Sequence, residues 1–459
     1  MLSSLSALVS SSSNFVLQTA LAFSLFLLLY FFKIPALFLH GLFTYVHPDD
    51  VNPTSSNGAR AAIRRPGSVE SELKPRKKSK DKFEFDENKA QIFRLKLIDT
   101  HLQTRIYFNE FKHAFNSTVV VLSCLLLDRF LGKSGDSGWL GDGSVVPVFL
   151  GCFVVCRIFV LIARTAFEGS SSKRMERQLS FLIGIFGFVL GLIIVSGVVP
   201  KWILDFDFGS LDGFGKLLVS LFMGCTAGFL YTPALRSARA FWLGTDQIRC
   251  NLSIISCGWF AGMLLYANYL MIALTSLLWI SPFAELLVNK NFDQKRGSCY
   301  GGRVEYATKL VGNVGMMRSD LDKFRLWCLL ASGILQIMSL RSNVQMYLNE
   351  AVLCWYQRLH SSKVPDLDYS RAKVFLHNHY LCLAVLQFFV PAAMILLLNG
   401  LSQTGDNLIS SFPWVCSLLP CSVLHKEVAL FMAWWVVFVL ATFTSSVLAL
   451  YRHGILYVS

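Results

Sequence analysis

The chain has 459 residues, of which 54% are hydrophobic and only 15% charged, and its formal net charge is +13. Soluble domains carry about 25% charged residues, so this chain has too few charges to cover a water-facing surface. The composition also excludes a disordered chain, a disulfide-rich secreted domain, collagen and a coiled coil. Because the apolar residues fall in long runs, the sequence predicts an all-α fold, that of a polytopic helical membrane protein.

Nine stretches are apolar and long enough to cross a membrane, since a helix needs about 20 apolar residues to span roughly 30 Å of hydrocarbon. These predicted spans are Phe15–Phe32, Phe111–Leu131, Val145–Ala166, Leu179–Val199, Phe214–Thr232, Ile254–Leu287, Phe324–Met346, Val374–Asn399 and Glu427–Tyr451. The first could instead be a cleaved signal peptide, which would leave eight spans. No Lys or Arg precedes it and its apolar run is long for a signal, so we predict a retained span.

Two of the predicted spans have features of their own. The sixth, Ile254–Leu287, is too long for one straight crossing. Either its first half is a cytoplasmic or interfacial helix, or the helix is tilted and bent, and we expect one crossing centred near Asn268–Trp279. In the fourth, Gly187 and Gly191 form a GxxxG pattern, which predicts close packing against another helix.

The sequence divides into three parts. We predict a membrane anchor over residues 1–46, a basic cytoplasmic linker with an amphipathic helix over 47–110, and a multi-pass helical membrane domain over 111–459. Within the second part, Pro53–Lys82 is rich in Ser, Pro, Asn and basic residues, which is typical of a disordered linker. From Glu87 to Asn109, apolar residues recur at helical spacing with basic residues between them. This pattern predicts an amphipathic helix in the inner membrane interface.

Basic residues predict which side of the membrane each loop faces, because cytoplasmic loops are enriched in Lys and Arg. Residues 46–111 are strongly basic and are therefore predicted to be cytoplasmic, with the N-terminus outside. Six of these residues form a patch that we expect to contact anionic lipid of the inner leaflet, not nucleic acid: Lys74, Arg76, Lys77, Lys78, Lys80 and Lys82. One loop disagrees, since alternation places residues 289–323, with seven Lys or Arg, outside.

A search for chemistry finds no catalytic, cofactor or metal motif in the sequence. It contains no phosphate-binding loop and no HExxH or GxSxG motif. His377 and His379 lie two residues apart, so on a helix they point to different faces and are expected to be interfacial. Cys416 and Cys421 fall in a loop predicted to be outside, where they could form a disulfide. We therefore expect a non-enzymatic protein without a cofactor.

Polar side chains at membrane depth are the most informative residues, because each one costs at least a few kcal/mol when it has no partner. Six of them form a candidate polar seam: Asn268, Arg325, Gln336, Arg341, Gln345 and Asn349. Helical geometry places Arg325 and Gln336 on one face of the seventh span. Arg341 and Gln345 line the opposite face, and Arg341 is expected to be buried within the bundle. The seam either carries or gates an ion, or consists of interfacial side chains that reach the headgroups.

Several segments resemble the transmembrane protein 161 family, of the A/B type. In colinear order they are Gly228–Arg236, Tyr266–Leu270, Leu278–Pro282, Phe324–Trp327, Leu340–Asn349, Val374–Pro391, Ala433–Trp435 and Tyr451–Val458. The resemblance covers about residues 110–459, and the Arg325–Asn349 block is its most specific part. Residues 1–110 match in layout only, and the loop at 401–425 is shorter than in vertebrate-type members.

The resemblance implies a multi-pass protein of the plasma membrane or an endomembrane, without known catalysis. Members of the family are linked to modulation of ion currents and to protection against oxidative stress, which makes ion channels or other membrane proteins the expected partners. Two alternatives remain. One is a secondary transporter with a midplane site around Asn268 and a helix broken at Pro282. The other, an intramembrane enzyme acting on lipid, is disfavoured because no His, Asp or Ser pairs cluster at one depth.

Overall fold

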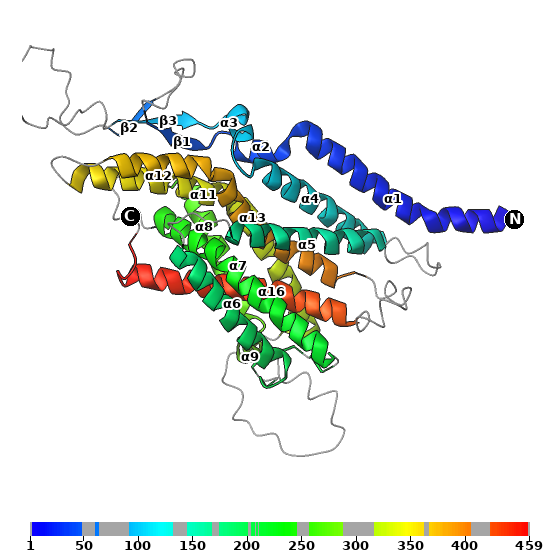
Figure 1. Cartoon of the computed structure of the whole chain (residues 1–459). Coiled ribbons are helices and arrows are strands. Elements are labelled where there is room, and N and C mark those ends of the chain that lie inside the picture. Colours follow the sequence, from blue (N-terminus) through cyan, green and yellow to red (C-terminus); the bar gives the residue numbers. More distant parts are fainter. Residues whose placement is uncertain are drawn as a thin grey trace, which may run out of the picture.

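In the computed structural model, the chain folds into a bundle of long helices with a small β-sheet at one end (Figure 1). The structure describes residues 2–47, 60–63, 91–131, 145–167, 174–200, 203–206, 208–209, 211–245, 257–287, 316–361, 367–404 and 423–457. We call the end of the bundle that holds the strands the sheet end. The opposite end, where Leu204 pairs with Ile280, is called the far end.

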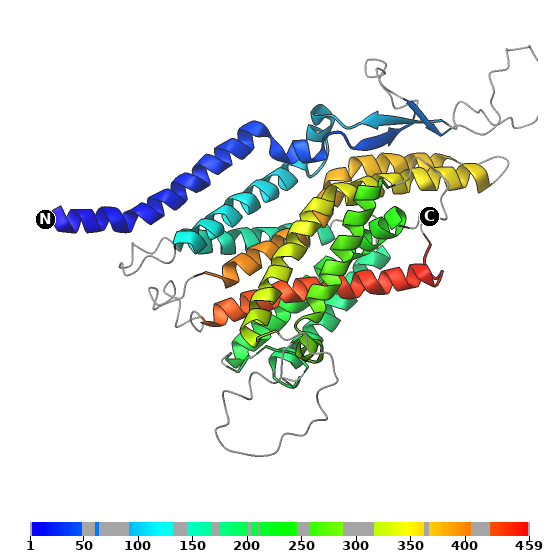
Figure 2. The same ribbon diagram turned by 180° about the vertical axis from the view of Figure 1, so that it is seen from behind.

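Nine long helices of the described part run between these two ends, and each reverses the direction of the one before it (Figure 2). They are α1 (Leu2–Phe32), α4 (Phe108–Leu131), α5 (Val145–Phe167), α6 (Arg174–Val195), α7 (Gly213–Thr245), α8 (Trp259–Leu277), α11 (Arg318–Ser361), α13 (Leu381–Ser402) and α16 (Val423–Arg452). Seven of them, all except α1 and α4, are long and apolar enough to cross a membrane. The prediction of an all-α polytopic membrane protein is confirmed.

The centre of the bundle is α13, whose whole apolar length is buried. A helix that is apolar on all sides is expected to be surrounded by protein or lipid, and α13 is surrounded by α4, α5, α11 and α16. By contrast, only 22% of the apolar stretch of α6 is buried within the protein. The peripheral helices therefore present their remaining apolar surface outward, as expected of a bundle dissolved in lipid.

Small residues hold α6 against α7. A Cβ added at Gly187 would lie 2.7 Å from Cβ of Ala227, and one added at Gly224 would lie 2.7 Å from the Gly184 carbonyl oxygen. Such close approach increases the van der Waals contact that drives helix association in lipid. The packing role predicted from the GxxxG pattern is confirmed.

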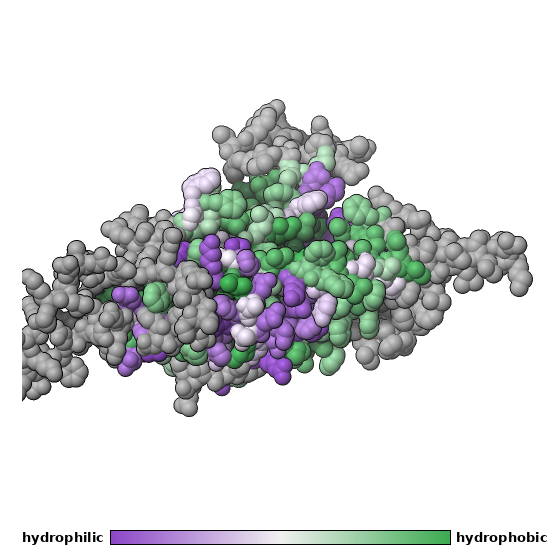
Figure 3. All heavy atoms as spheres, turned by 90° about the horizontal axis from the view of Figure 1, so that it is seen from above, coloured by the Kyte–Doolittle hydropathy of each residue, from purple (hydrophilic) through white to green (hydrophobic). Residues whose placement is uncertain are grey.

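At the sheet end, three strands form an antiparallel sheet in the order β1-β3-β2. They are β1 (Phe43–Val46), β2 (Arg60–Ile63) and β3 (Ile92–Lys96), and the short helices α2 (Ile34–Leu39) and α3 (Asp99–Gln103) flank the sheet. Seen from this end, hydrophilic residues gather on the part of the surface that holds the sheet, whereas the surface over α1 and α4 is mainly hydrophobic (Figure 3).

Two predictions for this region are wrong. The stretch Glu87–Asn109 was expected to be one amphipathic helix, but its described residues form β3 and only the five-residue helix α3. Strand β3 gains backbone hydrogen bonds from β1, a partner about 50 positions earlier that local periodicity does not reveal. In the stretch Pro53–Lys82, which was expected to be disordered, the four residues of β2 are instead ordered, and the other residues lie outside the described part of the chain.

Two predicted spans are interrupted. The sixth consists of α8, a turn at Leu278–Ile280 and the seven-residue helix α9 (Ser281–Leu287), so it makes one crossing and breaks just before Pro282. The eighth was expected to start at Val374, but that residue belongs to the separate helix α12 (Asp368–His379). Tyr380 leaves helical geometry between α12 and α13, with φ −94° and ψ 19°.

Helix α11 is the longest in the described part of the chain, with 44 residues. At 1.5 Å per residue it extends about 66 Å, roughly twice the thickness of the hydrocarbon core. It begins at the far end and passes the mid-depth of the bundle, and its last turns lie beneath the sheet beside α12 (Figure 1). A single rigid element therefore reaches from one end of the protein to the other.

Candidate functional site

Polar side chains of α11 gather with those of its neighbours at three depths. At the sheet end lies a cavity of about 410 Å³, which we call the sheet-end cavity. At mid-depth a much smaller cavity of about 30 Å³, the mid-helix cavity, lies between α7, α8, α11, α13 and α16. At the far end, charged residues surround Arg325.

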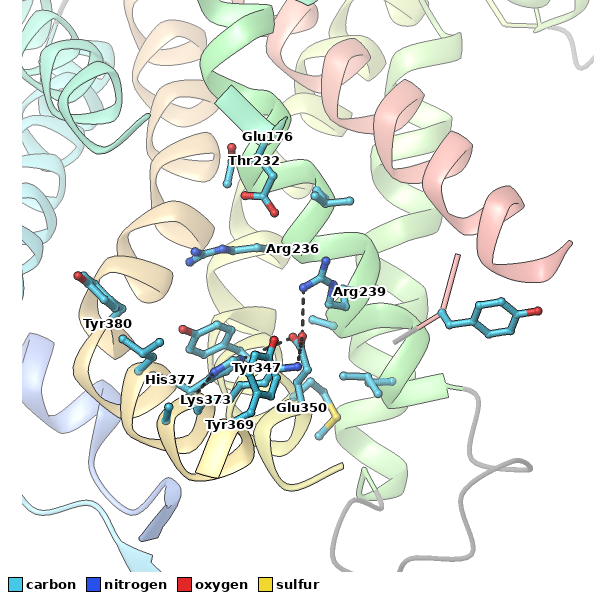
Figure 4. A pocket seen from close by; sticks show the side chains of 17 residues that line it. Glu176, Thr232, Arg236, Arg239, Tyr347, Glu350, Tyr369, Lys373, His377 and Tyr380 are labelled. Carbon is cyan, nitrogen blue, oxygen red and sulfur yellow. Dashed lines mark hydrogen bonds and ion pairs between the residues drawn. The ribbon is translucent and has the colours of Figure 1, made fainter. Parts of the chain in front are cut away.

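The sheet-end cavity is lined mainly by α7, α11 and α12, with single contributions from α6 and the chain after α16 (Figure 4). Its ionisable side chains are Glu176, Arg236, Arg239, Tyr347, Glu350, Tyr369, Lys373, His377, Tyr380 and Tyr457. The spacing within each helix explains why they meet. Arg236 and Arg239 are three residues apart on α7, and Tyr347 and Glu350 are three apart on α11, so each pair shares a helix face.

The buried carboxylate of Glu350 is the hub of this cavity, with only 6% of its side chain exposed. Nη1 of Arg239 lies 3.0 Å from its Oε1 and Nζ of Lys373 lies 3.8 Å from the same atom. Nε2 of His377 lies 4.0 Å from Oε2, while Nδ1 of that ring is 2.9 Å from the carbonyl oxygen of Lys373. Because Nδ1 then donates, Nε2 attracts the carboxylate only when the imidazole is protonated.

Arg236 lies in the same cavity without an ion pair among the described residues. Its guanidinium carbon is 5.4 Å from the ring centroid of Tyr347, and its buried Nη1 atom has no hydrogen-bond partner. Figure 4 shows Arg236 extending across the cavity, whereas Arg239 turns toward Glu350. The cavity therefore contains one cation whose charge is not neutralised by a neighbouring carboxylate.

The mid-helix cavity brings together two residues of the predicted seam, Asn268 and Gln336, along with Asn343. Oδ1 of Asn268 and Nε2 of Gln336 are both buried without a hydrogen-bond partner. Nδ2 of Asn343 lies 3.3 Å from the hydroxyl of Ser339. A cavity of this volume has room for one or two water molecules, which could bridge the unsatisfied acceptor and donor.

At the far end, Arg325 is buried, with 5% of its side chain exposed. Its Nη1 lies 2.8 Å from Asp205 and 3.2 Å from Asp322, and its Nε donates to the carbonyl oxygen of Leu278 at 3.0 Å. The guanidinium carbon also lies 5.4 Å from the ring centroid of Trp279. This arginine does not snorkel to a headgroup, because its charge is neutralised within the protein.

The last two residues of the predicted seam attach the sheet to α11. The side-chain amide of Gln345 accepts from the backbone N–H of Phe43 at 2.9 Å and donates to the carbonyl oxygen of the same residue at 3.1 Å. Oδ1 of Asn349 accepts from the hydroxyl of Tyr45 at 3.0 Å. Burial raises the pKa of that hydroxyl, so it stays a donor at neutral pH. Gln345 and Asn349 therefore hold the sheet against α11.

The prediction that Arg341 is buried within the bundle is wrong, because its side chain is exposed. At 100° per residue it lies about 140° around the helix from Gln336, which faces the bundle interior. It is directed instead toward the turn at Gly41, where a Cβ would lie 3.4 Å from its Nη2. The predicted seam thus separates into different environments and does not form one continuous line.

Some predicted sites lie outside the described residues. These are the basic patch of Lys74, Arg76, Lys77, Lys78, Lys80 and Lys82, and the pair Cys416 and Cys421. Among the residues that the structure describes, no three His, Cys, Asp or Glu side chains are grouped so that they could hold a metal ion.

Arg236, Arg239 and Glu350 were not predicted to form one site, because α7, α11 and α12 are far apart in the sequence. A signal was nevertheless present: two arginines three residues apart at the end of an apolar span, and a glutamate directly after Asn349. Ionisable residues placed this way within a span are functional candidates by default.

The family model described as Predicted transmembrane protein 161AB matches residues 212–419. Over this segment the chain is similar to the transmembrane protein 161 family, in agreement with the resemblance of its sequence. Within this family segment lie α7, α11 and α12, and hence every cavity-lining side chain except Glu176 and Tyr457. This similarity and the seven helices that are long and apolar enough to cross a membrane support an integral membrane protein. No solved structure gives a significant match.

Proposed function

We propose that this chain is a non-enzymatic membrane protein that modulates ion flux across its membrane without conducting ions itself. The observation that supports this proposal is the separation of the polar groups along α11. Large charged cavities lie at its sheet end and far end, with volumes of about 410 and 330 Å³, whereas the mid-helix cavity has only about 30 Å³. A pore needs a continuous hydrated path, but a regulator needs a binding surface and an element that transmits a change.

Helix α11 is suited to transmit such a change. It contributes Glu350 to the sheet-end cavity and Arg325 to the far-end cluster, and about 37 Å of helix separates these two residues at 1.5 Å per residue. A change in the charges around Glu350 would bias the position of α11, and with it the ion pair of Arg325 with Asp205. The role in ion-current modulation that the family resemblance implies fits this arrangement, and protection against oxidative stress would be a downstream consequence.

Electrical recordings on cells that lack the protein test this proposal. We expect their whole-cell currents to differ from those of the parent cells, and to be restored by the wild-type chain. Arg239→Gln, which removes the 3.0 Å partner of Glu350, should restore them poorly. The matched control is Arg177→Gln, because Arg177 is an exposed arginine at the same end of the bundle and does not line the cavity.

Recordings on the purified protein in liposomes separate modulation from conduction. We expect no conductance above that of protein-free liposomes. Conductance by the purified chain, or unchanged currents in cells without it, would contradict the proposal.

A secondary transporter is the second candidate. It is favoured by the break between α8 and α9, which places non-helical backbone at Leu278–Ile280 next to Arg325, and by the unsatisfied polar atoms of Asn268 and Gln336 at mid-depth. Interrupted helices and midplane polar groups are typical of transporter binding sites. Concentrative solute uptake into liposomes that is lost in Asn268→Leu would support this candidate over the regulator.

A further inference from the structure

We propose that the sheet-end cavity binds a phosphate group, carried either by the headgroup of an anionic lipid or by a soluble phosphorylated molecule. This inference rests on the proposed function in that it names the ligand of the cavity through which ion flux would be modulated. The binding itself follows from the charges, donors and surroundings of the cavity.

The balance of charge favours an anion. Three Lys and Arg side chains line the cavity but only two carboxylates, those of Glu176 and Glu350. Glu350 already has Arg239 at 3.0 Å and Lys373 at 3.8 Å. Glu176 makes no ion pair with Arg236 among the described residues. A cation held in a partly buried site without a counter-charge is unfavourable, and an incoming anion would relieve this.

The available donors favour phosphate among anions. Arg236 presents a planar guanidinium with an unpaired donor, and such a group matches two phosphate oxygens at once. The hydroxyl groups of Tyr347 and Tyr369 line the same cavity and can donate to further oxygens.

The surroundings favour a lipid headgroup as the source of the phosphate. Leu235, Leu243, Ala372 and Leu376 give part of the lining an apolar character. On α12, Tyr369, Phe375 and Leu376 are 48–57% exposed, as expected of a helix that rests against lipid. The cavity volume of about 410 Å³ also exceeds what a free phosphate ion occupies and leaves room for a headgroup.

The test is a titration of the purified full-length chain in a neutral detergent, followed through its melting temperature. One arm adds phosphatidylinositol phosphate in mixed micelles, a second adds phosphatidylcholine, a third adds a soluble inositol phosphate and a fourth adds inorganic phosphate. We expect saturable stabilisation by phosphatidylinositol phosphate and none by phosphatidylcholine. Stabilisation by the inositol phosphate as well would identify the phosphate group alone as sufficient, whereas stabilisation in the lipid arm only would identify a lipid headgroup.

Variants then locate the site. Arg236→Gln should weaken binding at least about tenfold, since hydrogen bonds from a charged donor to phosphate are strong. Arg177→Gln removes an equal charge from the same end of the protein outside the cavity and should leave binding unchanged. If Arg236→Gln fails to fold, Ala372→Trp provides the second variant, because it fills the cavity from an exposed position on α12 without altering a charge.

Two results would overturn the inference. One is the absence of saturable stabilisation in every phosphate arm, and the other is equal binding by wild type, Arg236→Gln and Ala372→Trp. Because no current is measured, the outcome is independent of the proposed function. Binding without any effect on cellular currents would retain the ligand site and reject modulation of ion flux, whereas altered currents without binding would do the reverse.

Discussion

An arginine lies beside each end of α11, Arg325 on α11 itself and Arg236 on the neighbouring α7, and the two differ in their surroundings. At the far end, Arg325 has two carboxylates within 3.2 Å and a backbone carbonyl oxygen at 3.0 Å. At the sheet end, Arg236 has an aromatic ring beside it and makes no ion pair with a carboxylate of the described residues. The charge of Arg325 is therefore neutralised within the chain, although its Nη2 is buried without a hydrogen-bond partner, whereas the charge of Arg236 has no ion pair among the described residues.

This difference separates structural charges from functional ones. A buried cation that is fully paired stabilises the fold only modestly, but its pairing must not be broken. A cation left without a counter-charge destabilises the protein on its own, so its presence calls for another explanation, such as a ligand. Substitutions at the far end should therefore reduce stability, and substitutions at the sheet end should mainly reduce binding.

The largest expected effect is that of Asp205→Asn at the far end. This change leaves buried Arg325 without its nearest counter-charge, so we expect the free energy of unfolding to fall by about 2–3 kcal/mol, below the full value for a buried pair because Asp205 is one-third exposed. Thermal unfolding in detergent measures it. The matched control is Asp320→Asn, whose exposed pair with Lys323 at 3.6 Å should contribute less than about 1 kcal/mol. Equal losses of stability in Asp205→Asn and Asp320→Asn would mean that the burial of Arg325 does not determine the cost of removing its counter-charge.

A smaller effect is expected for Glu350→Gln at the sheet end. The change leaves Arg239 and Lys373 without their shared carboxylate, but the cavity beside them can admit water and ions, so we expect a loss of about 1–2 kcal/mol. Inorganic phosphate should restore part of the melting temperature of this variant. The same addition should not rescue Asp205→Asn. If phosphate raised the melting temperature of both variants, or of neither, the two ends would not differ in their response to an anion.

The smallest loss of stability is expected when a contact between the sheet and α11 is removed. Asn349→Ala leaves the hydroxyl of Tyr45 without its acceptor, and we expect a loss of about 1 kcal/mol. Tyr45→Phe in the same background removes the stranded donor and should recover most of the loss. The backbone N–H of Phe43 donates to the side chain of Gln345, so its rate of hydrogen exchange reports whether the sheet loosens. Faster exchange with unchanged ligand binding is the expected result.

The membrane architecture followed from the sequence because apolar runs, loop charges and glycine spacing are local properties. The far-end site was partly accessible in the same way, since Arg325 lies within an apolar span and an unpaired arginine there is costly. Its acceptor Asp205, by contrast, lies between two predicted spans, where a carboxylate gives no such signal. The pairing depends on the loop returning to the start of α11, which no local pattern encodes.

The sequence was less informative at the sheet end for two physical reasons. Strand β3 depends on hydrogen bonds from β1, and its Phe93 and Leu97 also fit helical spacing, so the period was ambiguous. The charged cavity combines side chains from α7, α11 and α12, and each helix alone shows only two or three polar residues on the face that lines it. The sequence placed Arg341 on the helix face opposite Gln336, but it did not show what lies against that face. The exposure of Arg341 could therefore not be predicted.

The most direct test of the difference between the two ends is to replace each arginine by glutamine and to measure the melting temperature of both variants in neutral detergent without added phosphate or anionic lipid. We predict that Arg325→Gln lowers the melting temperature strongly, because Asp205 then keeps only the exposed Arg318 at 3.4 Å and the Leu278 carbonyl group loses its charged donor. Arg236→Gln should melt at the same temperature as the wild type or above it, since an uncompensated charge has been removed. An equal fall in both variants would contradict the account, because Arg236 would then be a structural residue and not one that is held for a ligand.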